Sequence, residues 1–152
     1  MTYDLPDAEA TGRLGAAIAL ALQPGEAVCL TGPLGAGKST LARALVRALT
    51  TPHEDVPSPT FTIVQFYETK RDGGHAFPLA HFDLYRLERA DEAFEIGLDE
   101  ALEEGAAVIE WPERLGGRLP PDRLDIDIAF DGEARTARLE PHGAWKGRKL
   151  EF

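Results

Sequence analysis

The stretch Gly32-Pro33-Leu34-Gly35-Ala36-Gly37-Lys38-Ser39 matches the phosphate-loop pattern G-x-x-x-x-G-K-[ST] in full. An apolar segment precedes it and a helical pattern follows it, which is the context that this motif requires. Glycines allow successive backbone N–H groups to face an anion, and the helix N-terminus adds a positive dipole. Lys38 is expected to reach the β- and γ-phosphates, and the Ser39 hydroxyl to coordinate Mg²⁺. The stretch predicts a nucleoside triphosphate site.

The composition favours adenine as the base. Guanine-specific proteins with this loop usually bind the base through an Asn-Lys-x-Asp sequence, and this chain contains no asparagine. It also has no Asp-x-x-Gly sequence after a predicted strand. ATP is therefore the expected nucleotide.

Helical and strand patterns alternate on both sides of the loop. Before it, residues 7–22 are predicted to form a helix with Asp7 as N-cap, and 26–31 a buried strand of the parallel type. After it come a predicted helix over 38–49, strands over 61–66, 79–83 and 106–109, a helical region over 90–104, and a hairpin of 124–130 and 134–139. This order predicts an α/β P-loop NTPase-like domain with a mostly parallel central sheet flanked by helices and a C-terminal antiparallel hairpin.

The length of 152 residues fits one domain spanning 1–152. Its last ten residues, 143–152, contain Trp145 and three basic residues, a pattern that fits a flexible tail at least as well as a basic patch for RNA.

Charge argues against direct, non-specific nucleic-acid binding. Sixteen basic against twenty-six acidic residues give 16 − 26 = −10, so the chain has no general attraction for a phosphate backbone. Eleven acids but only two arginines lie between Asp83 and Glu113. A solvated helix face and a docking surface for a basic partner explain this acidic stretch equally well.

Several other classes are excluded. Cys29 is the only cysteine, which leaves no disulfide and no thiolate cluster for zinc, and its place in an apolar strand predicts a buried, inert thiol. The apolar runs are much shorter than the roughly 20 residues that span a bilayer. The N-terminus lacks the pattern of a secretory signal. A cytoplasmic protein with no membrane association is expected.

Two acids lie at or just after the ends of predicted strands, as a P-loop site requires for Mg²⁺ or its water ligands. Asp83 and Glu110 both qualify, and their spacing does not rank them. His81 shares a strand face with Asp83, but two ligands do not make a metal site, so strand packing is the favoured role for His81. Taken alone, the loop Ser58-Pro59-Thr60-Phe61 indicates a turn before a strand.

Four motifs in order carry a family resemblance. They are the phosphate loop continued to Thr40, then 58–61, then His81-Phe-Asp-Leu-Tyr-Arg-Leu87, then Ile109-Glu-Trp-Pro-Glu113. Together they resemble the TsaE (YjeE) family, the ATPase component of the bacterial tRNA threonylcarbamoyladenosine modification machinery. Residues 5–11 and the closing hairpin resemble that family too, so the resemblance covers about the whole chain.

The resemblance implies a role for individual residues. Lys38, Thr60, Asp83 and Glu110 match catalytic positions, and Ser39, Glu110 and Asp83 match positions associated with Mg²⁺. Two positions depart from the family pattern: Pro33 stands where Asp is common, and Ser39 where Thr is usual. Neither change alters the expected chemistry. The positions expected to bind the nucleotide are Gly32, Leu34, Gly35, Ala36, Gly37, Lys38, Ser39, Thr40 and Trp111.

The same resemblance implies Mg²⁺-dependent ATP hydrolysis that is slow alone and gated by the partner proteins TsaD and TsaB, with tRNA contacted only through them. Arg86 is a candidate arginine finger, although ion pairing with the acidic stretch is the favoured role. A small-molecule or nucleotide kinase is the alternative function, but the arginines are scattered and no lid is evident. A nucleotide-dependent binding module without turnover is the third.

Overall fold

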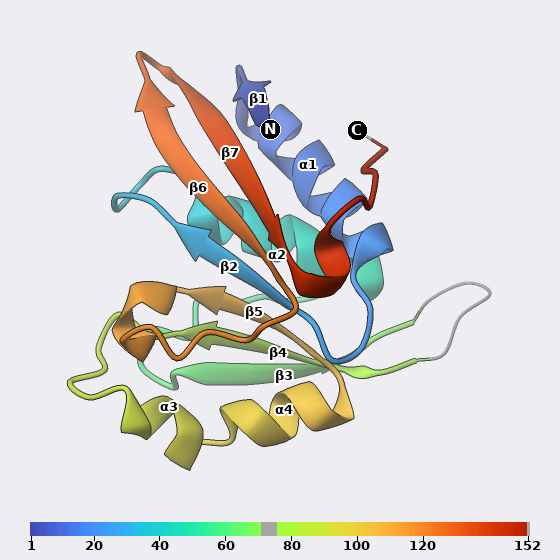
Figure 1. Cartoon of the computed structure of the whole chain (residues 1–152). Coiled ribbons are helices and arrows are strands. Elements are labelled where there is room, and N and C mark those ends of the chain that lie inside the picture. The colour runs from blue at the N-terminus through green and yellow to red at the C-terminus, as the bar shows by residue number, and fades with distance from the viewer. Residues whose placement is uncertain (71–75, 152) are drawn as a thin grey trace.

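The computed structural model describes residues 1–70 and 76–151 (Figure 1). Seven strands form one sheet in the order β1-β7-β6-β2-β5-β4-β3. The strands are β1 (Thr2–Leu5), β2 (Ala27–Thr31), β3 (Val64–Glu68), β4 (Pro78–Asp83), β5 (Ala106–Glu110), β6 (Arg123–Asp131) and β7 (Ala134–His142). The helices are α1 (Ala8–Ala21), α2 (Lys38–Leu49), α3 (Asp91–Glu95) and α4 (Leu98–Glu104), with short 3-10 turns η1 (Pro112–Leu115) and η2 (Gly143–Trp145).

The centre of the sheet is parallel and its outer strands are antiparallel. Strand β2 pairs in parallel with both β5 and β6, and β5 pairs in parallel with β4. Strand β3 is antiparallel to β4, and β7 is antiparallel to both β6 and β1. The α/β class, the parallel centre and the C-terminal hairpin are confirmed. The antiparallel outer strands make the sheet as a whole mixed. One of them, β1, was not predicted by the sequence analysis.

Helices α1 and α2 cover one face of the sheet, and α3 and α4 cover part of the other (Figure 1). Asp7 caps α1 as predicted, because its side chain accepts a hydrogen bond of 2.8 Å from the backbone N–H of Ala10. The helical region predicted over 90–104 is two helices, because Gly97 adopts a left-handed conformation with φ of 101° between them.

Strand β2 is buried on both faces, which explains its continuous apolar run. Val28 and Leu30 pack with α1 and α2, while Ala27 and Cys29 pack on the side of α3 and α4. Burial raises the pKa of the Cys29 thiol from 9.0 to about 12, with a smaller contribution from Asp125. The predicted burial of the thiol is therefore confirmed, and a raised pKa favours the protonated, less reactive form.

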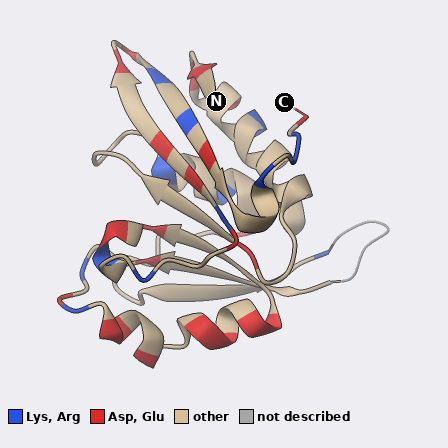
Figure 2. Cartoon of the chain, viewed as in Figure 1, with Lys and Arg blue, Asp and Glu red and all other residues tan. Residues whose placement is uncertain are grey.

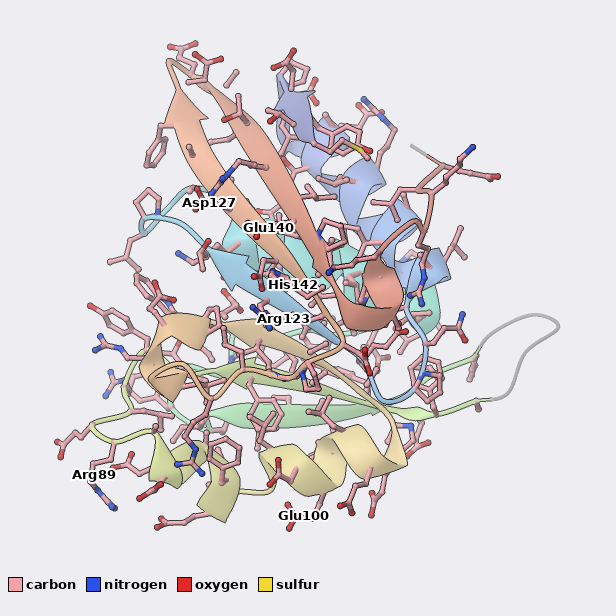
Figure 3. All side chains as sticks on the ribbon, viewed as in Figure 1. Arg89, Glu100, Arg123, Asp127, Glu140 and His142 are labelled. Carbon is pink, nitrogen blue, oxygen red and sulfur yellow. The ribbon has the colours of Figure 1, made fainter. Side chains whose placement is uncertain are left out.

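The face of β6 and β7 that α1 does not cover carries polar side chains. Arg123, Asp127, Glu140 and His142 lie along these strands (Figure 3). Asp125, in the same row, accepts a hydrogen bond of 3.0 Å from Arg123 Nε and lies 3.0 Å from His142 Nε2. The apolar residues that alternate with them face the helices, as the period of two predicts.

The end of the chain packs against the core as far as it is described. Trp145 in η2 is only 2% exposed. Arg148 lies over the Trp145 ring and binds both carboxylate oxygens of the buried Glu26, at 2.7 and 2.8 Å. Trp145 is therefore not available as an exposed aromatic for stacking on RNA.

Acidic side chains are concentrated on α3 and α4 (Figure 2). Asp91 pairs with Arg118 at 2.5 Å, and Glu92 lies 3.8 Å from Arg89. The other acids of the two helices, Glu95, Asp99, Glu100, Glu103 and Glu104, are exposed. No helix of residues 1–70 or 76–151 is long and apolar enough to cross a membrane.

The close packing of α1 on α2 depends on Gly15. A Cβ added there would lie 2.8 Å from the carbonyl oxygen of Leu41, a backbone atom that cannot move aside alone. Gly15→Ala is expected to lower the free energy of unfolding by about 1–3 kcal/mol, as overpacking does. Urea unfolding measures the change.

Gly12→Ala, in the same helix, is the matched control. Its Cβ would meet only the Ala44 methyl group, at an ordinary distance of 3.9 Å. The higher helix propensity of alanine should then raise stability by about 0.5–1 kcal/mol. Equal effects of the two substitutions would contradict the proposed packing constraint.

Candidate functional site

The phosphate loop connects the end of β2 to the start of α2 and depends on glycine backbone conformations. Gly32, Gly35 and Gly37 have φ values of 141°, 81° and 114°. A Cβ on Gly32 would lie 2.4 Å from the carbonyl oxygen of Ile128 in β6. Glycine therefore lets the loop run against the neighbouring strand.

Lys38, the first residue of α2, folds its side chain back over the loop. Its Nζ donates hydrogen bonds to the carbonyl oxygens of Gly32 and Pro33, the second at 3.2 Å. The same atom lies 4.2 Å from the centre of the Trp111 ring. Burial lowers the pKa of Lys38, and nearby carboxylates, with Glu110 first among them, oppose that shift.

Ser39 and Glu110 meet at the carboxyl edge of the sheet. Ser39 Oγ donates a hydrogen bond of 3.2 Å to Glu110 Oε1. The other carboxylate oxygen, Oε2, lies 2.7 Å from Nε2 of His81. His81 and Glu110 are both only 2% exposed. His81 is thus packed within its strand, as expected, but it also has a polar partner that its spacing did not predict.

Asp83 lies beside Glu110 in the register of β4 and β5, yet it has different partners. Its Oδ2 accepts a hydrogen bond of 3.2 Å from the Thr60 hydroxyl, and its Oδ1 one of 3.1 Å from the backbone N–H of Tyr85. The Ser58 and Thr60 hydroxyls lie 2.8 Å apart. These contacts connect the loop of 58–63 to the end of β4.

The 58–63 loop ends in an unusual backbone conformation. Ile63 has a φ of 72°, and its carbonyl oxygen accepts a hydrogen bond of 2.8 Å from the Asp83 N–H. A β-branched residue in this region is strained. The strand predicted from 61 begins three residues later, at Val64, because residues 61–63 form this turn. Phe61, which is 80% exposed, instead lies under the Arg86 guanidinium, 4.2 Å from its ring centre.

An aromatic pair lies beside Lys38. The Trp111 and Tyr85 ring centres are 4.9 Å apart. Trp111 directly follows Glu110 and has a φ of 60°, a left-handed conformation that turns the chain sharply out of β5. The sequence analysis gave Tyr85 no role, although its place two residues after Asp83 could have suggested a position near the site.

These side chains surround a pocket of about 320 Å³. Most residues that the sequence analysis assigned to the site line it. Gly32 contributes the carbonyl oxygen that binds Lys38, and Ala36 is buried behind the loop. The assigned residues that line the pocket are Leu34, Gly35, Gly37, Lys38, Ser39, Thr40, Thr60, Asp83, Glu110 and Trp111, together with Ser58 and Tyr85.

A second hollow of about 150 Å³ adjoins the first, because Gly35, Gly37 and Thr40 line both. Its other walls include Thr11 from α1 and Arg135 from β7, whose Nη2 lies 3.5 Å from the Gly35 carbonyl oxygen. The sequence analysis assigned neither residue to the site. They are far from the loop in sequence and only the fold brings them to it.

The oxygen atoms at this edge of the sheet fit a Mg²⁺ ion that binds together with the phosphates of a nucleotide. Among the described residues, no three His, Cys, Asp or Glu side chains are grouped so that they could hold a metal alone. Ser39, Glu110 and Asp83 place one hydroxyl and two carboxylate groups in one pocket. Mg²⁺ typically binds one or two carboxylates and completes its shell with water and phosphate oxygens. The glycine conformations of the loop likewise fit a phosphate chain.

Comparisons with known proteins find similar sequences over most of the chain. A family model described as threonylcarbamoyl adenosine biosynthesis protein TsaE matches residues 5–138. The tRNA threonylcarbamoyladenosine biosynthesis protein TsaE of Rickettsia conorii is 33% identical over 138 residues, covering 90% of this chain and 76% of that protein. Its Mycobacterium bovis counterpart is 36% identical over 133 residues, covering 84% and 77%.

A solved structure has the same fold. The crystal structure of Bacillus subtilis YdiB superposes with a TM-score of 0.72 at 29% identity. The superposition covers 94% of this chain and 86% of that one.

The buried charge of Lys38 is expected to cost stability in the absence of a ligand. Its pKa is lowered because burial outweighs the attraction of the nearby carboxylates, so folding disfavours the charged form. Lys38→Met should therefore unfold at a higher urea concentration than the wild type at neutral pH. Water can replace the amine at the two loop carbonyls.

Lys146→Met, which changes an exposed lysine, should shift the urea midpoint little. A lower midpoint for Lys38→Met than for the wild type would show that the contacts of the amine outweigh its burial.

Proposed function

Because this chain belongs to the TsaE family and acts in tRNA threonylcarbamoyladenosine biosynthesis, we propose that it does so as a Mg²⁺-dependent ATPase. The observation that carries the proposal is the phosphate loop whose lysine lies in one pocket with the Ser39–Glu110 pair and Asp83. A loop with no ligand has no need of a buried lysine followed by a hydroxyl bonded to a buried carboxylate.

The two adjoining hollows suit the two ends of ATP. The phosphates lie along the loop toward Lys38 and Ser39, and the nucleoside occupies the hollow lined by Thr11 and Arg135. Arg135 lies over the Phe130 ring, 4.4 Å from its centre, so its guanidinium is held against this hollow. The absence of asparagine favours ATP over GTP.

Ser39, Glu110 and Asp83 would hold Mg²⁺, directly or through its water ligands. Mg²⁺ held by these residues would supply positive charge against the negative charge that develops on the phosphate oxygens during transfer. Glu110 is the better candidate for direct contact with Mg²⁺, because it already accepts a hydrogen bond from the Ser39 hydroxyl. Both oxygens of Asp83 instead accept hydrogen bonds, from the Thr60 hydroxyl and the Tyr85 N–H.

Lys38 would leave the Gly32 and Pro33 carbonyls and donate to the β- and γ-phosphate oxygens. Thr60 and Asp83 would orient a water molecule on the far side of the γ-phosphate. The water oxygen bonds to phosphorus as the bond to the bridging oxygen breaks. ADP leaves, and the inorganic phosphate takes up the water's protons or releases them to solvent.

Turnover by the isolated chain is expected to be slow. Among residues 1–70 and 76–151, no arginine lines the 320 Å³ pocket. Arg86, an exposed residue, lies over the Phe61 ring and is not among the described residues that line this pocket. Arginine fingers supply a large part of the rate in related phosphoryl transfers. We therefore propose that the partners TsaD and TsaB stimulate or gate the cycle and that they, rather than this acidic chain, hold the tRNA.

Lys38→Ala tests hydrolysis. The substitution removes the basic side chain expected at the β- and γ-phosphates, so release of inorganic phosphate from Mg-ATP should fall by about 100-fold or more. Lys146→Ala, at an exposed lysine, should hydrolyse ATP like the wild type. Unchanged hydrolysis by purified Lys38→Ala protein would contradict the assignment.

The same assay separates the other functions. Transfer of labelled γ-phosphate to an added acceptor, rather than release as inorganic phosphate, would indicate a kinase. Stabilisation by Mg-ATP without turnover would indicate a binding module. At 100 times its dissociation constant, a ligand raises the free energy of unfolding by about 2.7 kcal/mol, which thermal unfolding detects.

The proposed gating of the cycle by TsaD and TsaB leads to a separate prediction. Immobilised TsaD–TsaB should capture the wild-type chain in a manner that depends on Mg-ATP, and should lose that dependence with Lys38→Ala. Immobilised tRNA alone should capture neither protein. Equal capture with and without nucleotide would contradict the gating, and capture by tRNA alone would contradict the indirect role of RNA.

A further inference from the structure

A buried histidine next to the proposed metal side of the pocket has no role in the function described so far. His81 lies in β4, and its Nε2 is 2.7 Å from Glu110 Oε2. The opposite oxygen of that carboxylate, Oε1, accepts the hydrogen bond from Ser39. One carboxylate thus joins a buried imidazole to the phosphate-loop hydroxyl.

The direction of the hydrogen bond follows from the chemistry of the two groups. An ionised carboxylate only accepts hydrogen bonds, so Nε2 carries the hydrogen and donates it to Glu110. The other ring nitrogen, Nδ1, is buried and has no hydrogen-bond partner among the described residues. Glu110 is therefore the polar group that orients this ring.

A carboxylate at the end of a glutamate side chain rotates easily about its last bond. With Oε2 held by His81, that rotation is blocked and Oε1 stays directed at Ser39. Asp83, next to Glu110 in the sheet, is held instead by Thr60 and a backbone N–H, so its orientation does not depend on His81.

We propose that His81 is a positioning residue that fixes the Glu110 carboxylate so that Oε1 is presented to the Mg²⁺ shared with Ser39. This inference rests on the proposed function, because it assigns His81 to the metal side of that same site. His81 is not among the residues that line the pocket, so it acts through Glu110.

Removal of such an outer partner typically weakens metal affinity by about 10- to 100-fold. His81→Leu is expected to weaken Mg²⁺ binding to the nucleotide complex within that range. Nucleotide affinity in EDTA should stay within about twofold, because His81 is not among the described residues that line the pocket. His81→Gln keeps an N–H donor that can bond to Oε2 and should retain most of the Mg²⁺ affinity.

The experiment measures binding of a fluorescent ADP to the full chain, first in EDTA and then during a Mg²⁺ titration. Wild type, His81→Leu, His81→Gln and His53→Leu are compared, the last being an exposed histidine used as control. Loss of Mg²⁺ affinity in His81→Leu with recovery in His81→Gln supports the role. Equal Mg²⁺ affinity of His81→Leu and wild type overturns it, as does an equal loss in both variants.

The outcomes distinguish this inference from the function on which it rests. If the wild type binds no nucleotide, or binds it without any effect of Mg²⁺, the proposed function fails and this inference fails with it. If the wild type responds to Mg²⁺ and His81→Leu responds equally, only the role of His81 fails.

A measurement on the unaltered chain covers the case in which His81→Leu does not fold. With ¹⁵N-labelled histidine, addition of Mg²⁺ to the ADP complex should shift the His81 Nε2 resonance more than those of the other three histidines. An unmoved His81 resonance would overturn the inference.

Discussion

The parallel pairing of β5 with both β2 and β4 is the constraint on which the site depends. It places Glu110 beside Leu30, two residues before the phosphate loop, and beside Asp83 at the end of β4. The carboxyl ends of these strands meet at one edge of the sheet, which is where α/β sheets bind ligands. A shift in either pairing would separate Glu110 from Ser39 or Asp83 from Glu110. On the β6 side of β2, Gly32 lets the phosphate loop pass close to the backbone of Ile128.

Two strained residues lie where the chain leaves this edge. Ile63, three residues after Thr60, and Trp111, directly after Glu110, both have left-handed backbone conformations without being glycine. Strain of this kind persists only where surrounding contacts impose it and is concentrated at functional sites. Here the contacts are the hydrogen bonds from the Asp83 N–H to Ile63 and from the Trp111 N–H to Leu30. Both connect the sheet to segments that line the pocket, to which Thr60 and Trp111 contribute side chains.

Sequence patterns predicted the parts of this arrangement that local chemistry determines. The glycine-rich loop, the buried strands and the acids at their ends have signals within a few residues, and Asp83 and Glu110 meet as strand ends should. The hydrogen bond between His81 and Glu110 had no local signal, because the two residues are 29 positions apart and meet only through the register of β4 and β5. Thr11 and Arg135 were missed for the same reason. The break at Gly97 escaped detection because the apolar spacing continues across it.

The central claim is that the carboxyl edge of this sheet is a triphosphate site in which Lys38, Ser39 and Glu110 act together. A crystal structure with Mg²⁺ and a non-hydrolysable ATP analogue tests it most directly. The expected result is that Lys38 Nζ has left the Gly32 and Pro33 carbonyls for the β- and γ-phosphates, with the metal between Ser39 and Glu110. Phosphates bound elsewhere, with Lys38 still on those two carbonyls, would contradict the claim.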